Sequence, residues 1–432
     1  MSEMLEKRQH NNSEIAVGID LTDEYAQISY GYMDEQEVET IIANPITQSY
    51  MIPTALFKRS EVNQWFAGND AVKNKDMEGW YIDNLVTLAK EGNPVTVGEE
   101  TFAPTALLSL FIKRALSIIN PIAMPGKIAS YMITVPNLDE QMIAALAKTV
   151  SNLGIKAGNI AFQSYTESIY YYMIFQDHEL WNRDVLVLSS AADRIRAYRM
   201  ECNRNTTPVV AFIKEKELPI SDISMAPSNL PPERLKEIDE SIASYIQTVC
   251  DNRLFSSAYL IGDVFKGKWY EQTSANLCRK ARVFQGNNLF SKGAAYSARN
   301  KLVVSALSEG HVFLGSDKLK SNVGMNVERR GENAYYALLD AGINWYEAFM
   351  ECDLILNQGN RLSFVITPLT GRNPQIIDVT LDDLPKRPPK TTRIHMTLKM
   401  ESESRLAVNV ADMGFGELFP ASDIQWNEVI DV

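Results

Sequence analysis

The residue types that bind metal ions or act as nucleophiles are scattered along this chain of 432 residues. Its four histidines lie far apart, and none of them belongs to an HExxH motif of the kind that holds zinc in metal hydrolases. Its four cysteines are also widely separated and include no CxxC pair. The sequence therefore predicts reduced, buried thiols and neither a zinc site nor a disulfide framework.

A cluster of tyrosines stands out in the segment YTESIYYY, at residues 165–172. At helical spacing, tyrosine rings are typical of packing between structural layers, and the alternative is a stacking platform for nucleic acid. The formal charge of −12 and the pI near 5.0 favour packing, because nucleic acids and anionic membranes both require a basic face. We expect neither nucleic acid nor a membrane as a partner.

The N-terminal residues MSEMLEKRQHNNSEI are polar and charged, unlike a signal peptide. The most apolar stretch, Thr105 to Ile119, is interrupted by Lys113 and Arg114. It therefore indicates an amphipathic, packed helix rather than a membrane span. We expect residues 1–13 to form a polar tail and the protein to be cytoplasmic.

Strand and helix patterns alternate over about the first 300 residues and then give way to strands alone. The early part contains a buried strand, a tight turn and a second strand, followed by strand–helix units and a second strand pair (residues 14–33, 127–155, 159–175 and 184–202). Asn137, Asp139 and Glu140 stand where a helix start would place capping and acidic groups. Beyond residue 311, apolar and polar residues alternate at the spacing of a β-sandwich. We place a domain boundary between Leu302 and His311.

The order of these segments resembles that of the DnaK-type seventy-kilodalton heat-shock chaperones, within the actin-like ATPase superfamily. The similar segments are GIDLTDEYAQISYG, MIPTALF, KIASYMITVP, FQSYTESIYYYM, SAYLIGD and NNLFSKGAAYSA. The stretch from Leu384 to Gly416 is similar to the last strands of the peptide-binding sandwich of that family. The resemblance covers most of the chain, from Ile15 to Gly416.

The resemblance implies an α/β actin-like ATPase fold of two ribonuclease-H-like lobes, followed by an all-β sandwich like the chaperone substrate-binding domain. We expect the nucleotide-binding-like domain over residues 14–305, with a reduced second lobe. The sandwich is expected over residues 311–418 and a C-terminal tail over residues 419–432. Only sixteen residues follow Gly416, so we expect no helical lid.

The resemblance also implies a nucleotide site with Asp20 and Glu167 as the catalytic residues. Asp20 would hold Mg²⁺ through water, as the metal residue, and Glu167 would position the attacking water. The alternative is that both carboxylates only form hydrogen bonds in a cleft. The candidate cofactor-binding residues are Asp20, Leu21, Thr22, Asp23, Ser189, Ser190, Gly262 and Asp263.

The two phosphate loops depart from the pattern of the family. The first loop, Asp-x-Gly-Thr-Thr in the family, here reads Asp20-Leu21-Thr22-Asp23-Glu24, and the glycine-rich second loop is replaced by a stretch around Ser189 and Ser190 that has no glycine. Glycine is required where a backbone adopts φ > 0 or approaches a ligand closely. Asp23 and Glu24 would repel a triphosphate, and their alternative role is a solvated turn. We therefore expect binding of ATP or ADP with magnesium to be weak or absent, as in a pseudo-ATPase.

The leading prediction for function is a chaperone-like protein that binds polypeptides or partner proteins through its lidless sandwich. A J-domain-type co-chaperone is a candidate partner. Two alternatives remain, an active ATP-driven chaperone and an actin-like scaffold or structural protein. The candidate peptide-binding residues are Met325, Val327, Phe349 and Phe364, although a shift of one residue in register would turn any of them into the core. The run Lys386 to Lys390 (KRPPK) is expected to be an exposed, rigid turn.

Overall fold

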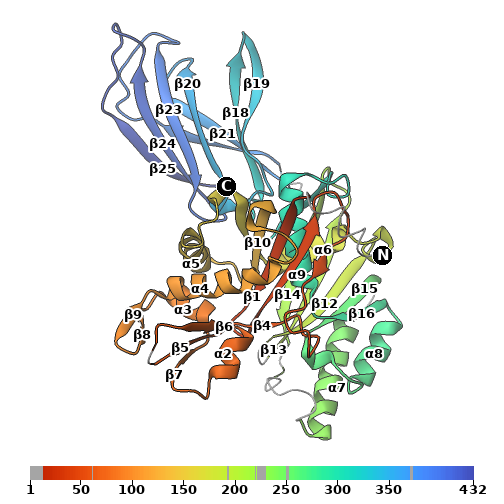
Figure 1. Cartoon of the computed structure of the whole chain (residues 1–432). Helices are drawn as coiled ribbons and strands as arrows, with labels where there is room; N and C mark the ends of the chain where they lie inside the picture. Colours follow the sequence, from red (N-terminus) through yellow and green to blue (C-terminus); the bar gives the residue numbers. More distant parts are fainter. Residues whose placement is uncertain are drawn as a thin grey trace. The chain divides into compact units, whose positions relative to one another are not determined.

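The computed structural model describes residues 13–60, 62–191, 194–218, 220, 230–249, 253–369 and 373–432. The chain divides into two compact units (Figure 1). The N-terminal unit holds residues 1–202 and 213–309, and the C-terminal unit holds residues 203–212 and 310–432. Of the predicted polar tail, only Ser13 lies within the described residues.

The first sheet of the N-terminal unit has the strand order β11-β10-β1-β2-β3, and β4 also pairs with β2. Its strands are β1 (Ile15–Leu21), β2 (Tyr25–Tyr32), β3 (Glu39–Thr40), β4 (Ile52–Pro53), β10 (Ile128–Val135) and β11 (Ile160–Ser164). β1 is antiparallel to β2 and parallel to β10, which is parallel to β11. A hairpin thus lies beside two parallel strands.

The second sheet of this unit repeats that arrangement with the order β16-β15-β12-β13-β14. Its strands are β12 (Asp184–Ala191), β13 (Arg194–Asn203), β14 (Val209–Glu217), β15 (Phe255–Ile261) and β16 (Arg282–Gly286). β12 is antiparallel to β13 and parallel to β15, and β15 is parallel to β16. Both sheets therefore share one connectivity, a hairpin followed by two parallel strands.

Helices cover both faces of each sheet (Figure 1). The α-helices of this unit include α2 (Asn69–Asn74), α3 (Leu85–Glu91), α4 (Pro104–Leu116), α5 (Glu140–Ser151), α6 (Tyr165–Ile174), α7 (Pro232–Val249), α8 (Glu271–Cys278) and α9 (Leu289–Leu302). Odd-numbered residues of β1, such as Ile19, share a core with α4 and α5, whereas Ala16 packs with α9. This split follows from the alternation of side chains along a strand.

α6 and α9 lie between the two sheets. Tyr172 of α6 contacts Tyr259 of β15 at 5.9 Å between ring centroids, and Phe290 of α9 contacts Tyr198 of β13 at 6.4 Å. α9 lies directly on the backbone of β1, because a Cβ atom at Gly18 would overlap backbone atoms of Ser291 and its neighbours in that helix. Glycine at this position therefore permits the close approach that fixes α9 on the sheet.

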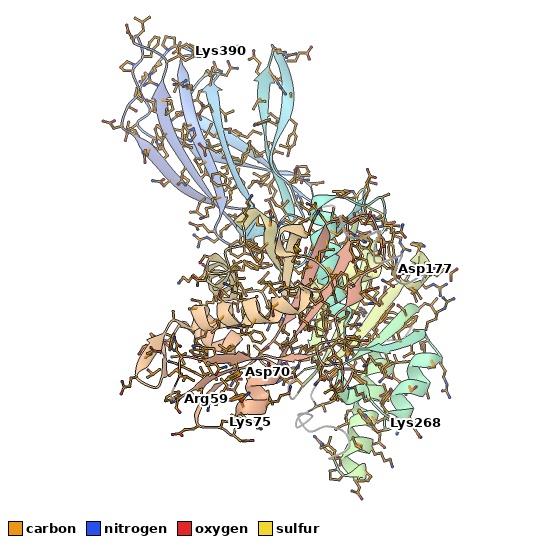
Figure 2. All side chains as sticks on the ribbon, in the orientation of Figure 1. Arg59, Asp70, Lys75, Asp177, Lys268 and Lys390 are labelled. Atoms are coloured by element: carbon orange, nitrogen blue, oxygen red, sulfur yellow. The ribbon has the colours of Figure 1, made fainter. Side chains whose placement is uncertain are left out.

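A smaller part of the N-terminal unit consists of short antiparallel strands beside α2. These are β5 (Leu56–Arg59), β6 (Trp65–Ala67) and β7 (Gly79–Ile82), and the pair β8 (Val95–Val97) and β9 (Glu100–Phe102). The ammonium of Lys58 lies over the Trp65 ring and forms an ion pair with Glu100. Arg59 and Lys75, by contrast, are exposed and extend outward in Figure 2.

The C-terminal unit consists mainly of two four-stranded antiparallel sheets, with the orders β19-β18-β21-β22 and β20-β23-β24-β25. The strands are β18 (Ser321–Arg329), β19 (Glu332–Leu339), β20 (Phe349–Leu356), β21 (Arg361–Pro368), β22 (Gln375–Thr380), β23 (Thr392–Met400), β24 (Arg405–Gly414) and β25 (Gln425–Asp431). β17 (His311–Phe313) pairs with residues 209–211 of β14. Inward-facing residues of both sheets, including Phe364 and Met396, form one shared core.

The Pro-rich turn before β23 is anchored by a buried ion pair. Arg387 and Asp412 form two hydrogen bonds of 2.7 Å, and their side chains are 5% and 0% exposed. Asp412 also accepts hydrogen bonds from Gly414 N and from Ser422 N and Oγ. The prediction of an exposed turn at residues 386–390 is therefore wrong for Arg387, because its guanidinium finds a carboxylate 25 residues away, which the local sequence does not reveal.

We predict that Asp412→Asn destabilises the protein by about 3–5 kcal/mol, because it leaves the buried Arg387 guanidinium without its partner charge. Burial by itself would raise the pKa of Asp412, but hydrogen bonds from Arg387, Ser422 and Gly414 outweigh it and hold the pKa well below the usual range. The stability gained from this carboxylate is thus present above pH about 4 and lost as the pH falls towards its depressed pKa.

Urea unfolding of both proteins across this range measures the effect. The difference in the free energy of unfolding between the wild type and the variant should be largest at neutral pH and should decrease in acid. A difference below about 1 kcal/mol at neutral pH would contradict the assignment, since that is the size of an exposed ion pair.

Candidate functional site

A cavity of about 370 Å³ opens in the N-terminal unit at the hairpin ends of both sheets. It is lined by Leu21, Thr22, Asp23, Glu24, Val86, Thr87, Lys90, Pro136, Asn137, Met142, Tyr165, Ser189, Arg194, Arg196 and Tyr198. Four of the predicted cofactor-binding residues, Leu21, Thr22, Asp23 and Ser189, are thus brought together. This volume lies within the usual range of small-molecule sites.

Asp20 lies beneath this cavity rather than in its wall. Its side chain is fully buried, and Tyr165 donates a hydrogen bond of 2.7 Å from Oη to Oδ1 of Asp20. The Tyr165 ring in turn stacks on Phe290 at 3.7 Å between centroids. Burial raises the pKa of Asp20 to about 7, against hydrogen bonds from Tyr165 and Tyr25 that lower it. Tyr165 therefore separates the candidate metal ligand from the space that a ligand would enter.

A row of buried polar side chains crosses the first sheet at the level of Asp20. In register across four strands, Gln163 faces Thr134, Thr134 faces Asp20, and Asp20 faces Gln27. All four side chains are fully buried, and both amide atoms of Gln27 lack a hydrogen-bond partner within the described residues. Such a layer costs folding free energy and is typical of a functional region rather than of a core.

The polar groups of the turn between β1 and β2 form hydrogen bonds with one another. Thr22 N donates to Tyr25 O at 2.9 Å, and Tyr25 N donates to the Thr22 hydroxyl at 3.0 Å. A phosphate loop must leave its backbone N–H groups free for the ligand. In this turn the N–H groups of Thr22 and Tyr25 already have acceptors.

Asp23 occupies the N-terminal end of α3. Its Oδ1 accepts hydrogen bonds from Val86 N at 2.8 Å and Thr87 N at 3.0 Å, and its Oδ2 accepts one from the Thr87 hydroxyl at 2.6 Å. The carboxylate therefore satisfies N–H groups that have no partner within the helix. Asp23 is thus half-buried and fixed, while Glu24 is exposed.

The remaining predicted cofactor residues do not line the cavity. Ser190 packs against Gly262, which has φ = 108° and no space for a Cβ atom beside the Ser190 carbonyl. Asp263 is exposed and forms an ion pair with Lys266 at 2.8 Å. The resemblance predicted a nucleotide-binding site at Ser190, Gly262 and Asp263. The structure instead has a close contact between Ser190 and the backbone of Gly262, and a surface ion pair at Asp263.

Glu167 lies in the first turn of α6, after the N-cap residue Ser164, whose Oγ accepts a hydrogen bond from Glu167 N. It is buried and does not line the cavity. Tyr165, two residues earlier, lines it instead. The two predicted catalytic residues thus do not meet in an open site.

Three cationic side chains in the cavity wall were not predicted from the sequence. Arg194 pairs with Glu217 at 2.6 Å, Arg196 with Glu215 at 3.4 Å, and Lys90 with Asp139 at 2.5 Å. The alternation of Arg194, Arg196 and Tyr198 along β13 places them on one face of the strand. This alternation in the sequence could have predicted that the two arginines lie side by side. It could not have predicted that Glu215 and Glu217 of β14 neutralise them.

The predicted groove residues of the C-terminal unit are split between core and surface. Met325 and Phe364 are paired across β18 and β21 and are 6% and 0% exposed, so both belong to the core and their prediction as groove residues is wrong. The physical reason is the strand register, because alternate residues face opposite sides. Val327 is half-buried, and Phe349, on the edge strand β20, is 56% exposed.

We predict that Asp20→Asn stabilises the protein at alkaline pH and has little effect near pH 4. Between its unfolded pKa of 3.8 and its folded pKa of about 7, the native state holds a proton that the unfolded state has released, so stability falls as the pH rises. At full ionisation this corresponds to up to about 4 kcal/mol. Asparagine keeps an acceptor for Tyr165 but cannot ionise. Thermal melts of both proteins between pH about 4 and about 8.5 measure the difference in stability between them. A difference that does not change with pH would contradict the raised pKa of Asp20.

No helix within the described ranges has the length and apolar character needed to cross a lipid bilayer. A search of curated proteins finds no match to the chain. The domain of unknown function DUF8552 matches residues 318–432. The C-terminal part of the family of unknown function DUF5716 matches residues 37–316, which is more than half of the chain. The chain therefore belongs to the DUF5716 family.

Proposed function

We propose that this protein is a pseudo-ATPase of the actin-like superfamily, related to DnaK-type chaperones, that acts by binding polypeptides or partner proteins. The shared connectivity of the two sheets in the N-terminal unit supports two lobes of ribonuclease-H type. The two antiparallel sheets around one core support a β-sandwich in the C-terminal unit. Fold alone does not assign an activity, so the proposal depends on the site.

One observation supports the proposed loss of ATP hydrolysis. Tyr165 covers Asp20 and donates a hydrogen bond to its Oδ1, and the N–H groups of Thr22 and Tyr25 already have acceptors within the turn between β1 and β2. Oδ2 of Asp20 is buried and has no hydrogen-bond partner within the described residues. In addition, the Asp23 carboxylate lies at the start of α3 and would repel a triphosphate. Binding a nucleotide would require breaking these hydrogen bonds without an evident replacement. The N-terminal unit then serves as a scaffold.

The C-terminal unit is the candidate surface for polypeptides. Phe349 and Ile355 are 56% and 55% exposed on β20, which lies at the edge of its sheet. Glu351 and Asp353 lie between them on the same strand face and both contact His395. An edge strand can pair with an extended chain, and this order of side chains suits a peptide that presents two basic residues flanked by apolar ones on one face.

We predict no binding of Mg-ATP or Mg-ADP to protein stripped of nucleotide. Isothermal titration calorimetry at nucleotide concentrations up to about millimolar should give no heat, because Tyr165 covers Asp20 and the N–H groups of Thr22 and Tyr25 already have acceptors. A cooperative thermal melt of the same sample shows that the protein is folded. Micromolar binding would overturn the pseudo-ATPase proposal, and turnover abolished by Asp20→Ala and Glu167→Ala would establish the ATP-driven alternative.

We predict that Phe349→Ser weakens peptide binding by about tenfold, because exposed aromatic side chains dominate such contacts. The measurement is fluorescence anisotropy with a labelled seven-residue peptide that has leucine at its first and seventh positions, arginine at its third and fifth, and serine between them, so that the leucines and arginines share one face of the extended chain. The matched control is Ile376→Ser, which removes a 69% exposed side chain from β22, an edge strand of the other sheet. Equal effects of both substitutions, or no saturable binding, would exclude β20 as the site.

A further inference from the structure

The end of β24 and the chain after it, residues 413–422, here called the β24–β25 loop, present apolar side chains on a fixed segment. Met413, Phe415 and Leu418 are 42%, 44% and 86% exposed. Phe415 N donates to Phe419 O at 2.6 Å, which closes the tip of the loop. Exposed apolar residues that lie close together in this way are typical of contact surfaces.

The buried ion pair holds this loop at both ends. Asp412 accepts hydrogen bonds from Gly414 N and Ser422 N, each 2.9 Å, and Arg387 donates one of 2.8 Å to Pro420 O. A Cβ atom at Gly414 would overlap the backbone around Phe419, so the loop folds tightly on itself. A pre-organised loop loses little conformational entropy on binding, which favours its use as an anchor.

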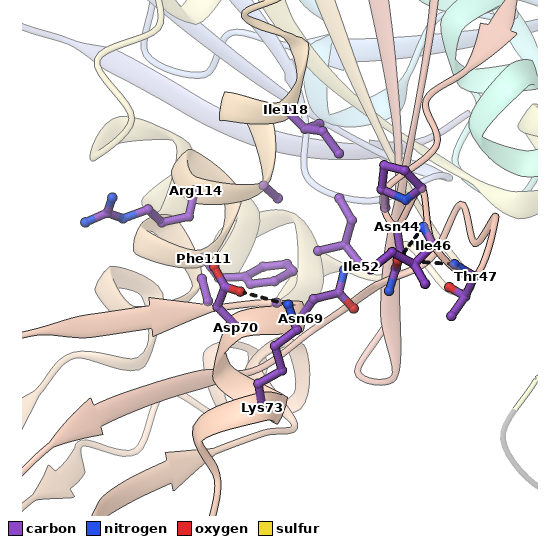
Figure 3. A pocket seen from close by; sticks show the side chains of 15 residues that line it. Asn44, Ile46, Thr47, Ile52, Asn69, Asp70, Lys73, Phe111, Arg114 and Ile118 are labelled. Carbon is purple, nitrogen blue, oxygen red and sulfur yellow. Dashed lines mark hydrogen bonds and ion pairs between the residues drawn. The ribbon is translucent and has the colours of Figure 1, made fainter. Parts of the chain in front are cut away.

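A second feature, in the N-terminal unit, is concave, as a receptor for such a loop requires. A groove of about 520 Å³ lies between the Asn44–Thr47 loop, α2 and α4 (Figure 3). Its lining is mainly apolar and includes Ile52, Phe111 and Ile118. The Asn44–Thr47 loop is fixed by Asn44 Oδ1, which accepts hydrogen bonds from Ile46 N at 3.0 Å and Thr47 N at 3.3 Å.

The charges at the two features are also complementary. Asp70 and Lys73 in the groove form an ion pair of 3.5 Å with each other. Arg114 extends from α4 on the side of the groove opposite the Asn44–Thr47 loop in Figure 3 and has no ion-pair partner within the described part of the chain. Glu417 is the exposed acid at the tip of the β24–β25 loop. A carboxylate in an apolar loop thus matches a guanidinium beside an apolar groove.

We propose that the β24–β25 loop of one copy inserts into this groove of a second copy, with Leu418 and Phe415 against the apolar lining and Glu417 paired with Arg114. Such a contact joins two different surfaces, so it is heterologous and can continue from copy to copy. An anionic membrane is a poorer occupant for the loop, because Glu417 and Asp423 would be repelled by it. A contact of one loop in one groove is small, so we expect association in the micromolar range or weaker.

Sedimentation velocity of the full chain over a wide concentration series tests the proposal. The wild-type protein should show a sedimentation coefficient that rises with concentration. Leu418→Asp and Arg114→Glu should each weaken association by about tenfold or more, because they place a charge against the apolar lining or reverse the charge pair. Ile376→Asp is the matched control, since it puts the same charge on an exposed apolar site outside the loop and should leave association unchanged.

A charge exchange separates the proposed pair from a general effect of charge. Arg114→Glu and Glu417→Arg chains, each impaired alone, should associate when mixed, because the acidic groove of one meets the basic loop of the other. The chain carrying both substitutions should also self-associate. A wild type that stays monomeric, association that persists in Leu418→Asp, or a mixture that fails to associate would overturn the proposal. Monomeric protein that binds vesicles of phosphatidylserine through Leu418 would instead assign the loop to a membrane.

Discussion

The hydrogen bond from Tyr165 to Asp20 links the layers of the N-terminal unit. Asp20 is the last residue but one of β1, the central strand of the first sheet, Tyr165 begins α6, and the ring of Tyr165 stacks on Phe290 of α9. Phe290 in turn contacts Tyr198 of the second sheet. Because α9 lies against the backbone at Gly18, neither the helix nor the stack can shift without disturbing β1. Asp20, which the resemblance to DnaK-type chaperones predicts as the metal residue, is therefore part of the packing between layers.

Carboxylates in this protein repeatedly serve backbone N–H groups instead of ligands. Asp23 accepts from the start of α3, Asp139 caps α5 through Met142 N, and Asp239 accepts from Gln272 N and Thr273 N at the start of α8. Asp412 does the same for the β24–β25 loop. Each acid stabilises the end of an element, where free N–H groups and the helix dipole favour negative charge. The acidic composition is thus partly structural, and it leaves less charge available for binding cations.

The cavity of the N-terminal unit and the exposed apolar side chains of both units bear on the proposed function. In the N-terminal unit, the cavity cations Lys90, Arg194 and Arg196 are each neutralised by an acid, which fits a scaffold better than an anion site. In the C-terminal unit, apolar residues stand exposed on β20 and on the β24–β25 loop. The N-terminal unit also exposes apolar side chains, such as Ile46 at 94%, so both units offer surfaces for the proposed protein contacts.

The sequence by itself determined the local features. The strand–turn–strand pattern around Asp20, the helix start at Asp139 and the strand-only pattern beyond residue 311 follow from periodicity and capping, which neighbouring residues specify. Only the tertiary structure decided what Asp20, Asp23 and Arg387 contact, since their partners lie 145, 63 and 25 residues away. It also decided that Met325 and Phe364 face the core, because the register of β18 and β21 is set by pairing across strands. Local pattern fixes which residues form an element, but contacts between distant elements decide whether a carboxylate holds a ligand or a helix end.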